Sequence, residues 1–285
     1  MPTTTSHFVS AADGMAIQSY RWDVPSPRAV VVIAHGAAEH ALRYDRFARA
    51  LNAAQFAVWA MDHRGHGQSP GPEGLGDFGP GGWDALVADI GQLIELAGEA
   101  HPGLPVVLFG HSMGSAAAQQ YAPEGSARIA ALILSGSTSW EAPKQGEAPP
   151  AFAPNAAFEP ARTPYDWLSR DTAEVDKYIA DPLCGFESQG ARRGRSRADP
   201  AALSDETRLR RIGSSLPCLL VAGDADPINR NLVGLNRLEE RWRAAGVLRI
   251  DTLYYAGGRH EMLNETNRDE VTADIIAWLR GVLPA

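Results

Sequence analysis

Short runs of almost wholly apolar residues recur along this chain, and they predict strands that are buried on both faces of a sheet. A strand covered on one face only would instead alternate apolar and polar residues with a period of two. The runs are AVVVIA at 29–34, FAVWAM at 56–61, PVVLFG at 105–110, AALILS at 130–135, PCLLVAG at 217–223 and, less strictly apolar, RIDTLYYAG at 249–257.

Segments with apolar residues three or four positions apart separate these runs and predict amphipathic helices. They are RYDRFARALNAA at 43–54, WDALVADIGQLIELAGEA at 83–100, SAAAQQYA at 115–122, LVGLNRLEERWRAAG at 232–246 and RDEVTADIIAWLRGVL at 268–283. Near the start, Asp13-Gly14 separates two strand-like segments and predicts a hairpin. The alternation of strands and helices after a hairpin predicts an α/β fold, an open and mostly parallel sheet with helices on both faces.

The alternation stops between residues 138 and 212, a stretch rich in Pro, Ala, Trp and Phe that has no β-branched run of strand length. It is too long for a plain loop in a compact domain, so we predict an inserted helical cap, or lid, at 138–212. The α/β core is then expected in two parts, residues 1–137 and 213–285.

Composition supports one globular protein, because 45% of the 285 residues are apolar and 21% are charged. The net charge of −8 provides no broad basic face for nucleic acid. The N-terminus has no basic stretch followed by an apolar run, and no window reaches the ~18 apolar residues of a spanning helix. With only Cys184 and Cys218, which lack metal-binding spacing, these features predict a cytoplasmic protein in a reducing compartment.

The pattern Gly-x-Ser-x-Gly occurs twice, around Ser69 and around Ser112, although about 0.2 copies are expected by chance in a chain of this composition. A nucleophile elbow needs a strand that enters the motif, a helix that leaves it, and a free N–H on the next residue. Ser112 meets these conditions, and the alternative for it is a helix N-cap. Ser69 lies in a glycine-rich loop and precedes Pro70, which has no N–H, so we interpret it as a turn residue.

A nucleophilic serine needs a histidine base and an acid that orients it, and in a parallel sheet these follow the carboxyl ends of later strands. Asp224 and Asp226 follow one predicted strand, and His260 follows the next. We favour Asp226 as the acid, because it lies further from the strand end, with Pro227 behind it. Asp224 is better suited to capping a turn.

An oxyanion hole requires two backbone N–H donors. The residue after the nucleophile, Met113, supplies one, and Ala37 in the loop after the first central strand is the candidate for the other. The alternative for that loop is a simple glycine turn that ends the strand.

Taken together, these residues resemble the α/β-hydrolases, and within them the monoacylglycerol lipase and lysophospholipase branch. The shared segments are HGAAEHALRYDRFARAL at 35–51, DHRGHGQSPG at 62–71, GHSMGS at 110–115, DPLCGF at 181–186, AGDADPI at 222–228 and GGRHEMLNE at 257–265. The resemblance implies Ser112 as nucleophile, Asp226 as acid, His260 as base, and the amides of Ala37 and Met113 as the oxyanion hole. It also implies that DHRGHGQS is a structural loop.

The activity implied is that of a serine carboxylic ester hydrolase, which cleaves monoacylglycerols or similar small acyl esters without a cofactor or metal ion. Lysophospholipase, thioesterase, peptidase and acyltransferase activities use the same triad and stay open as alternatives. A non-enzymatic ligand receptor with this fold is a further alternative. The sequence does not determine the oligomeric state.

The predicted cap has two notable sets of residues. Its aromatic side chains are expected either to line an acyl pocket or to pack the cap onto the sheet; they are Trp140, Phe152, Phe158, Tyr165 and Trp167. Four arginines lie at 192–197 where the family pattern leads us to expect apolar residues, namely Arg192, Arg193, Arg195 and Arg197. We interpret them as a solvated surface, with transient contact to an anionic membrane surface as the alternative.

Overall fold

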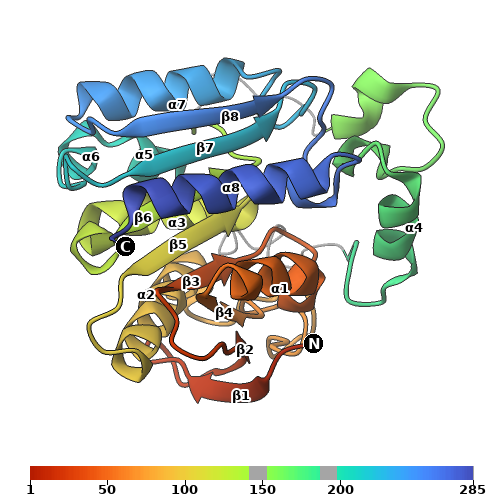
Figure 1. Ribbon diagram of the computed structural model, residues 1–285. Helices are drawn as coiled ribbons and strands as arrows, with labels where there is room; N and C mark the ends of the chain where they lie inside the picture. Colours follow the sequence, from red (N-terminus) through yellow and green to blue (C-terminus); the bar gives the residue numbers. More distant parts are fainter. Residues whose placement is uncertain (141–152, 187–197, 285) are drawn as a thin grey trace.

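The computed structural model describes residues 1–140, 153–186 and 198–284 and forms one eight-stranded sheet with helices on both faces (Figure 1). The strand order is β1-β2-β4-β3-β5-β6-β7-β8, in which β1, β2 and β4 are antiparallel neighbours and the remaining pairs are parallel. The strands are β1 (Thr4–Val9), β2 (Ala16–Trp22), β3 (Ala29–Ala34), β4 (Phe56–Met61), β5 (Val106–His111), β6 (Ala131–Ser135), β7 (Cys218–Gly223) and β8 (Ile250–Tyr255). The predicted α/β fold and its antiparallel start are confirmed.

The five strands from β3 to β7 in chain order are buried along their whole length, as their uninterrupted apolar runs require. In β3, Val30 and Val32 belong to one hydrophobic cluster while Val31 and Ile33 belong to the other. Successive side chains of each strand therefore anchor helices on opposite faces of the sheet.

One face of the sheet is covered by α1 (Asp45–Ala53) and α8 (Arg268–Val282), and the other by α2 (Gly82–Ala100), α3 (Met113–Gly125) and α7 (Val233–Ala244). Short 3-10 helices η1 (Ala41–Tyr44), η2 (Ser126–Arg128) and η6 (Met262–Asn264) lie in the connecting loops. Across the described residues, no helix combines the length and apolar character that a membrane span requires.

The segment predicted as a cap has two described parts at opposite ends of the strands (Figure 1). The first part lies beyond the carboxyl ends and holds η3 (Pro154–Phe158), η4 (Asp166–Leu168) and α4 (Thr172–Ala180). The second part, α5 (Pro200–Ser204) and α6 (Glu206–Leu209), packs with α3 in the core, where Leu203 and Leu209 are buried. The division of the chain at 138–212 stays a prediction, and Phe152 and the four arginines at 192–197 lie outside the described residues.

Candidate active site

Ser112 lies on a tight turn between β5 and α3, with backbone angles φ 51° and ψ −113°. This left-handed conformation is strained for a residue with a side chain, and it is typical of a nucleophile elbow. The flanking glycines make room for the turn: a Cβ on Gly110 would lie 2.6 Å from the carbonyl oxygen of Gly114, and one on Gly114 would overlap the carbonyl of Ala34. The strand, turn and helix therefore hold the hydroxyl of Ser112 at the start of α3.

A chain of hydrogen bonds joins Ser112 to two residues from later loops. The Oγ of Ser112 lies 2.8 Å from Nε2 of His260, and Nδ1 of His260 lies 2.9 Å from Oδ2 of Asp226. His260 is 2% exposed and Asp226 is 0% exposed. The Ser112 side chain does not cap α3. The geometry therefore brings the three predicted residues together in the order of nucleophile, base and orienting acid.

The two aspartates that follow β7 have different partners. The second carboxylate oxygen of Asp226 accepts the backbone N–H of Ile228 at 2.8 Å, which fixes the carboxylate toward His260. Asp224 instead accepts the backbone N–H of Gly257 at 2.7 Å, in the turn after β8. Asp226 is thus in the position expected for the acid, and Asp224 stabilises a turn.

Electrostatics around His260 favour its protonated form. Burial opposes the charge, but the hydrogen-bonded Asp226 carboxylate, with smaller contributions from Glu261 and Glu39, raises the pKa of His260 above its ordinary value. His111 shows the opposite effect, because burial and the nearby His260 lower the pKa of His111 to about 4. His111 lies beside the catalytic base, because its ring centroid is 4.8 Å from that of His260.

The two predicted oxyanion donors flank Ser112. Within the described part of the chain, the backbone N–H groups of Ala37 and Met113 have no hydrogen-bond acceptor. The loop that carries Ala37 lies against the nucleophile, since a Cβ on Gly36 would be 3.3 Å from Cβ of Ser112. Both amides are available to a developing oxyanion, and this role stays a prediction.

Ser69 is buried in the glycine-rich loop, and its contacts hold a turn. It is 1% exposed, and its Oγ accepts the backbone N–H of Gln18 at 2.8 Å, which ties the glycine-rich loop to β2. Its own N–H and carbonyl make turn hydrogen bonds with His66 and Gly65. A hydroxyl with these partners holds a turn, and the hydrogen bond that it makes among the described residues is to the backbone of Gln18 and not to a histidine ring.

The first part of the cap segment contacts two active-site loops, the one that carries Ala37 and the one that carries His260. The carbonyl of Ala38 accepts hydrogen bonds from the hydroxyl of Tyr178 at 3.0 Å and from the N–H of Gly185 at 3.0 Å. On the other side, the N–H of Glu261 donates to the carbonyl of Leu168 at 2.8 Å. Helix α4 and η4 are therefore joined to the loops that carry Ala37 and His260.

The four described cap aromatics differ in their contacts. The Trp167 ring lies 4.9 Å from the ring of His260, so it faces the candidate triad. The other three pack elsewhere: Trp140 against the core, Phe158 under the guanidinium of Arg259, and Tyr165 against Tyr178. Packing therefore accounts for these three, and an acyl pocket stays a prediction.

Of the described residues, one group could offer three metal ligands: His40, Asp181 and Cys184 place their ligand atoms within 4.8 Å of one another. Nε2 of His40 is already paired with Asp181 at 2.8 Å, and burial raises the pKa of the Cys184 thiol. We interpret the group as a contact between the oxyanion loop and the cap segment.

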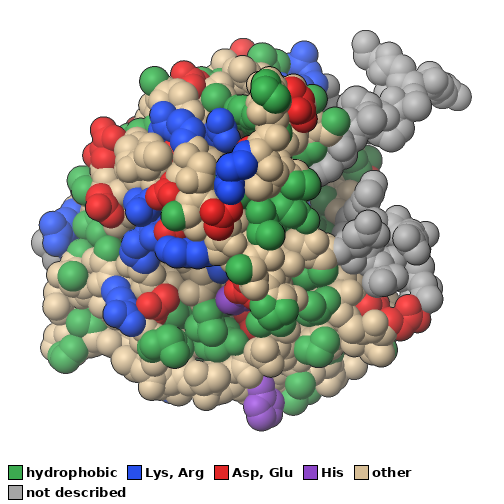
Figure 2. All heavy atoms as spheres, turned by 90° about the vertical axis from the view of Figure 1, so that its right-hand side faces the viewer, with side chains coloured by type: hydrophobic (Ala, Val, Ile, Leu, Met, Phe, Trp, Pro, Cys, Tyr) green, Lys and Arg blue, Asp and Glu red, His purple; other side chains and the backbone are tan. Residues whose placement is uncertain are grey.

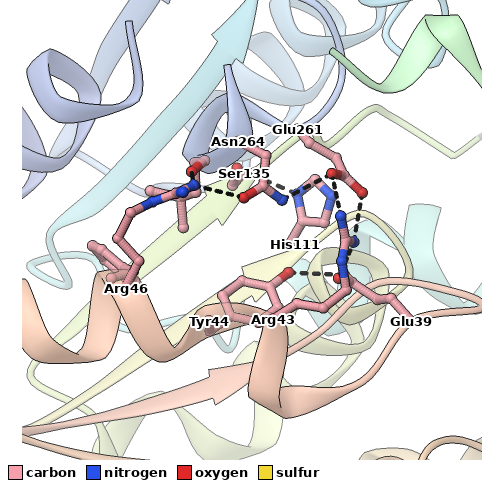
Figure 3. A pocket seen from close by; sticks show the side chains of 10 residues that line it. Glu39, Arg43, Tyr44, Arg46, His111, Ser135, Glu261 and Asn264 are labelled. Atoms are coloured by element: carbon pink, nitrogen blue, oxygen red, sulfur yellow. Dashed lines mark hydrogen bonds and ion pairs between the residues drawn. The ribbon is translucent and has the colours of Figure 1, made fainter. Parts of the chain in front are cut away.

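The sequence reasoning assigned no role to three charged residues that line a pocket together with His111: Glu39, Arg43 and Glu261 (Figure 3). All three are in segments that carried the family resemblance, HGAAEHALRY and GGRHEMLNE. Glu39 lies two positions after Ala37 and Glu261 directly follows His260, and this nearness is a signal that could have found both. Arg43 lies six positions after Ala37, so only its place in the shared segment points to it.

The sheet, the strained elbow and the aligned serine, histidine and aspartate define a serine hydrolase with the α/β-hydrolase fold. The family model described as serine aminopeptidase, S33, matches residues 25–267, and the chain belongs to this family.

Relatives with known names agree with this class. A monoacylglycerol lipase from Mycolicibacterium smegmatis is 32% identical over 289 residues, covering 97% of each chain. The structure of a thermostable carboxyl esterase from Bacillus coagulans, in complex with glycerol, is similar with a TM-score of 0.83 and 27% identity over 99% of both chains. The monoacylglycerol lipase of Paleococcus ferrophilus has a TM-score of 0.70 and 28% identity, covering 93% of this chain and 98% of that one.

Proposed function

We propose that this protein is a serine carboxylic ester hydrolase that cleaves monoacylglycerols or similar small acyl esters through an acyl-enzyme on Ser112. The observation that carries the proposal is the hydrogen-bonded chain from Ser112 through His260 to Asp226. The substrate class is supported by the monoacylglycerol lipases and the esterase that resemble the chain along nearly its whole length.

Each candidate residue has a defined step in this reaction. His260 takes the proton of Ser112 as its oxygen attacks the ester carbonyl, and the N–H groups of Ala37 and Met113 bind the resulting oxyanion. Protonated His260 then donates its proton to the departing alcohol, which leaves the acyl group on Ser112. Water, deprotonated by His260, releases the fatty acid by the same steps in reverse. Asp226 keeps the imidazole in the required tautomer and stabilises its charge.

Ester hydrolysis is favoured over aminopeptidase activity by the charges beside the triad. An aminopeptidase has to bind the ammonium group at the N-terminus of its substrate, for which a free carboxylate is suited. The carboxylates of Glu39 and Glu261 are both paired with Arg43. Neither is therefore left to bind an ammonium ion.

The surface beyond the carboxyl ends of the strands fits a lipid-like ester. Hydrophobic side chains gather on this face beside a region of mixed acidic and basic groups (Figure 2). On α4, Ile179 is 47% exposed. We infer that the cap segment makes transient contact with a membrane surface when lipid substrate enters. Binding to vesicles that Ile179→Ser leaves unchanged would argue against this contact.

The assignment of the nucleophile is tested by labelling with a fluorophosphonate probe. We expect the wild-type protein and Ser69→Ala to be labelled and Ser112→Ala to be unlabelled. Because both serines occur in the same five-residue pattern, Ser69→Ala is the matched control. Labelling that disappears in Ser69→Ala and persists in Ser112→Ala would reverse the assignment.

The substrate class is tested by comparing turnover of monoacylglycerols, lysophospholipids, acyl thioesters and aminoacyl anilides. We expect the highest kcat/KM with monoacylglycerols and short p-nitrophenyl esters. Faster cleavage of the anilides would support the peptidase alternative. Tight, saturable binding of a small ligand without turnover of any ester would support the receptor alternative.

A further inference from the structure

The guanidinium of Arg43 lies between two carboxylates that come from opposite ends of the chain (Figure 3). Its Nη1 is 2.6 Å from Oε2 of Glu39. Its two terminal nitrogens each lie 2.7 Å from one oxygen of Glu261, which is a bidentate pair. The side chains of Arg43, Glu39 and Glu261 are only 11%, 3% and 7% exposed, so solvent screens these ion pairs weakly.

Each of the two carboxylates is attached to a loop that holds a reacting group. The other oxygen of Glu39 accepts the N–H of Gly36 at 2.5 Å, directly before the predicted oxyanion donor Ala37. It also accepts the hydroxyl of Tyr44 at 2.8 Å. Glu261 follows His260 in the chain. A fixed position for Glu39 therefore fixes the oxyanion loop, and a fixed position for Glu261 fixes the histidine loop.

We propose that Glu39, Arg43 and Glu261 form a buried charged cross-link that holds the oxyanion donor and the catalytic histidine at the correct distance from each other. The three are positioning residues, since none of them touches the reacting atoms. This inference rests on the proposed function, because it assigns the cross-link to the triad that carries that reaction.

Two further contacts support a positioning role. The Arg43 guanidinium stacks 4.9 Å from the ring centroid of Tyr178, whose hydroxyl donates to the carbonyl of Ala38 in the same oxyanion loop. The His111 ring, one residue before the nucleophile, packs between this cluster and His260. The cross-link is thus in contact with every loop of the candidate site except the one that carries Asp226.

The cross-link also affects the charge on His260. Two carboxylates and one guanidinium carry one net negative charge, and both Glu261 and Glu39 contribute to raising the pKa of His260. Among the described residues, Asp226, Glu261, Glu39 and His111 act on the charge of the imidazole, and Arg43 is paired with the two glutamates. Removing one carboxylate of the cross-link is expected to lower the pKa of His260.

The test compares Glu39→Gln, Glu261→Gln and the double variant with wild type. Glutamine keeps the size of the side chain and an acceptor oxygen, but its amide cannot form an ion pair with Arg43. We expect each single variant to lower kcat for p-nitrophenyl butyrate by about tenfold to a hundredfold, below the loss of a complete oxyanion donor, with KM nearly unchanged. The rate constant for fluorophosphonate labelling should fall by a similar factor.

Comparing the double variant with the two single variants tests whether Arg43 connects the loop of Glu39 with the loop of Glu261. If one cross-link joins both loops, breaking it at either end has most of the effect, so the double variant should lose much less than the product of the two single losses. Glu261→Gln should also move the acidic limb of the kcat/KM profile to lower pH. Multiplicative losses, or a kcat that either single variant leaves unchanged, would overturn the proposal.

A matched control separates positioning from general stability. Asp89 is 1% exposed and pairs with the buried Arg64 at 2.8 Å, so Asp89→Asn removes a comparable buried ion pair. We expect Asp89→Asn to lower the Tm with little change in kcat. An equal loss of kcat in Asp89→Asn would reject the cross-link as a positioning device.

Two outcomes distinguish this inference from the proposed function. Wild-type protein that reacts with the fluorophosphonate but cleaves no ester would reject the proposed function, and the labelling rates would still test the cross-link. Ester hydrolysis that depends on Ser112 but is unaffected by Glu39→Gln would reject the cross-link and leave the proposed function standing.

Discussion

Buried neutral histidines make the stability of this protein depend on pH, and His66 allows the effect to be measured. Its ring is 2% exposed, packs between Phe78 and Phe186, and lies 3.0 Å from the carbonyl of Arg64 through Nδ1. Burial lowers the pKa of His66 from 6.5 to about 4. The folded protein therefore binds this proton much less readily than the unfolded chain does.

The sign and size of the effect follow from linkage. Between pH 4 and 6.5 the unfolded chain binds more protons at this position, so the contribution of His66 is complete above pH 6.5 and is lost as the pH falls. Because of this shift, the free energy of unfolding should be about 2 kcal/mol lower at pH 5 than at pH 8. His111, whose pKa is also lowered to about 4, should add a similar loss. His260 acts in the opposite direction, because its folded-state pKa is raised.

The assay is urea unfolding of wild type and His66→Asn at pH 8 and pH 5. Asparagine keeps a side-chain donor near the position of Nδ1 and does not titrate. We expect the variant to be less stable at pH 8, because the smaller side chain leaves a cavity, but to lose about 2 kcal/mol less than wild type between the two pH values. His7→Asn, at an exposed position on β1, is the matched control for replacing a histidine with asparagine. Equal losses in wild type and His66→Asn would refute the reasoning.

Four further outcomes are expected. Asp226→Asn should lower kcat by about 10⁴-fold in steady-state assays, because the amide favours the wrong tautomer of His260. A decrease in kcat of less than tenfold would contradict the role of Asp226 as the acid. Activity should fall as the pH drops through a midpoint above 6.5, since only neutral His260 accepts a proton and its pKa is raised. A midpoint below that value in the kcat/KM profile would contradict this. Gly114→Ala should abolish labelling and lower the Tm, because the added Cβ would overlap the carbonyl of Ala34 in β3. Gly98→Ala in α2 places its Cβ in open space and should raise the free energy of unfolding, measured in urea, by about 0.5–1 kcal/mol.

The positions of the central elements could be predicted from the sequence because their signals are local. The runs at 29–34 and 56–61 coincide with β3 and β4. The elbow around Ser112 was also local, since a strand, two glycines and a helix follow one another within a few residues. The helix after it extends further than predicted, from Met113 to Gly125, and includes Pro123. Packing of α3 on the sheet overrides the weak helical tendency at its end.

The cap segment was less predictable. A break in the alternation showed that residues 138–212 differ from the core, but it did not show that α4 lies over the carboxyl ends of the strands while α5 and α6 pack beside α3. Short helices with weak periodicity carry little information about which surface they cover. Their placement depends on long-range contacts such as the burial of Leu203 and Leu209 in the hydrophobic cluster beside α3.

The sequence by itself determined the fold class, the two serine motifs and the chain order of Ser112, Asp226 and His260, because each of these depends on neighbouring residues. Only the tertiary structure decided that His111 packs against His260 and that Arg43 joins Glu261, 218 positions away. The physical reason is that such contacts form only after the strands have paired in their final order. No local sequence pattern predicts which loops then meet at the edge of the sheet.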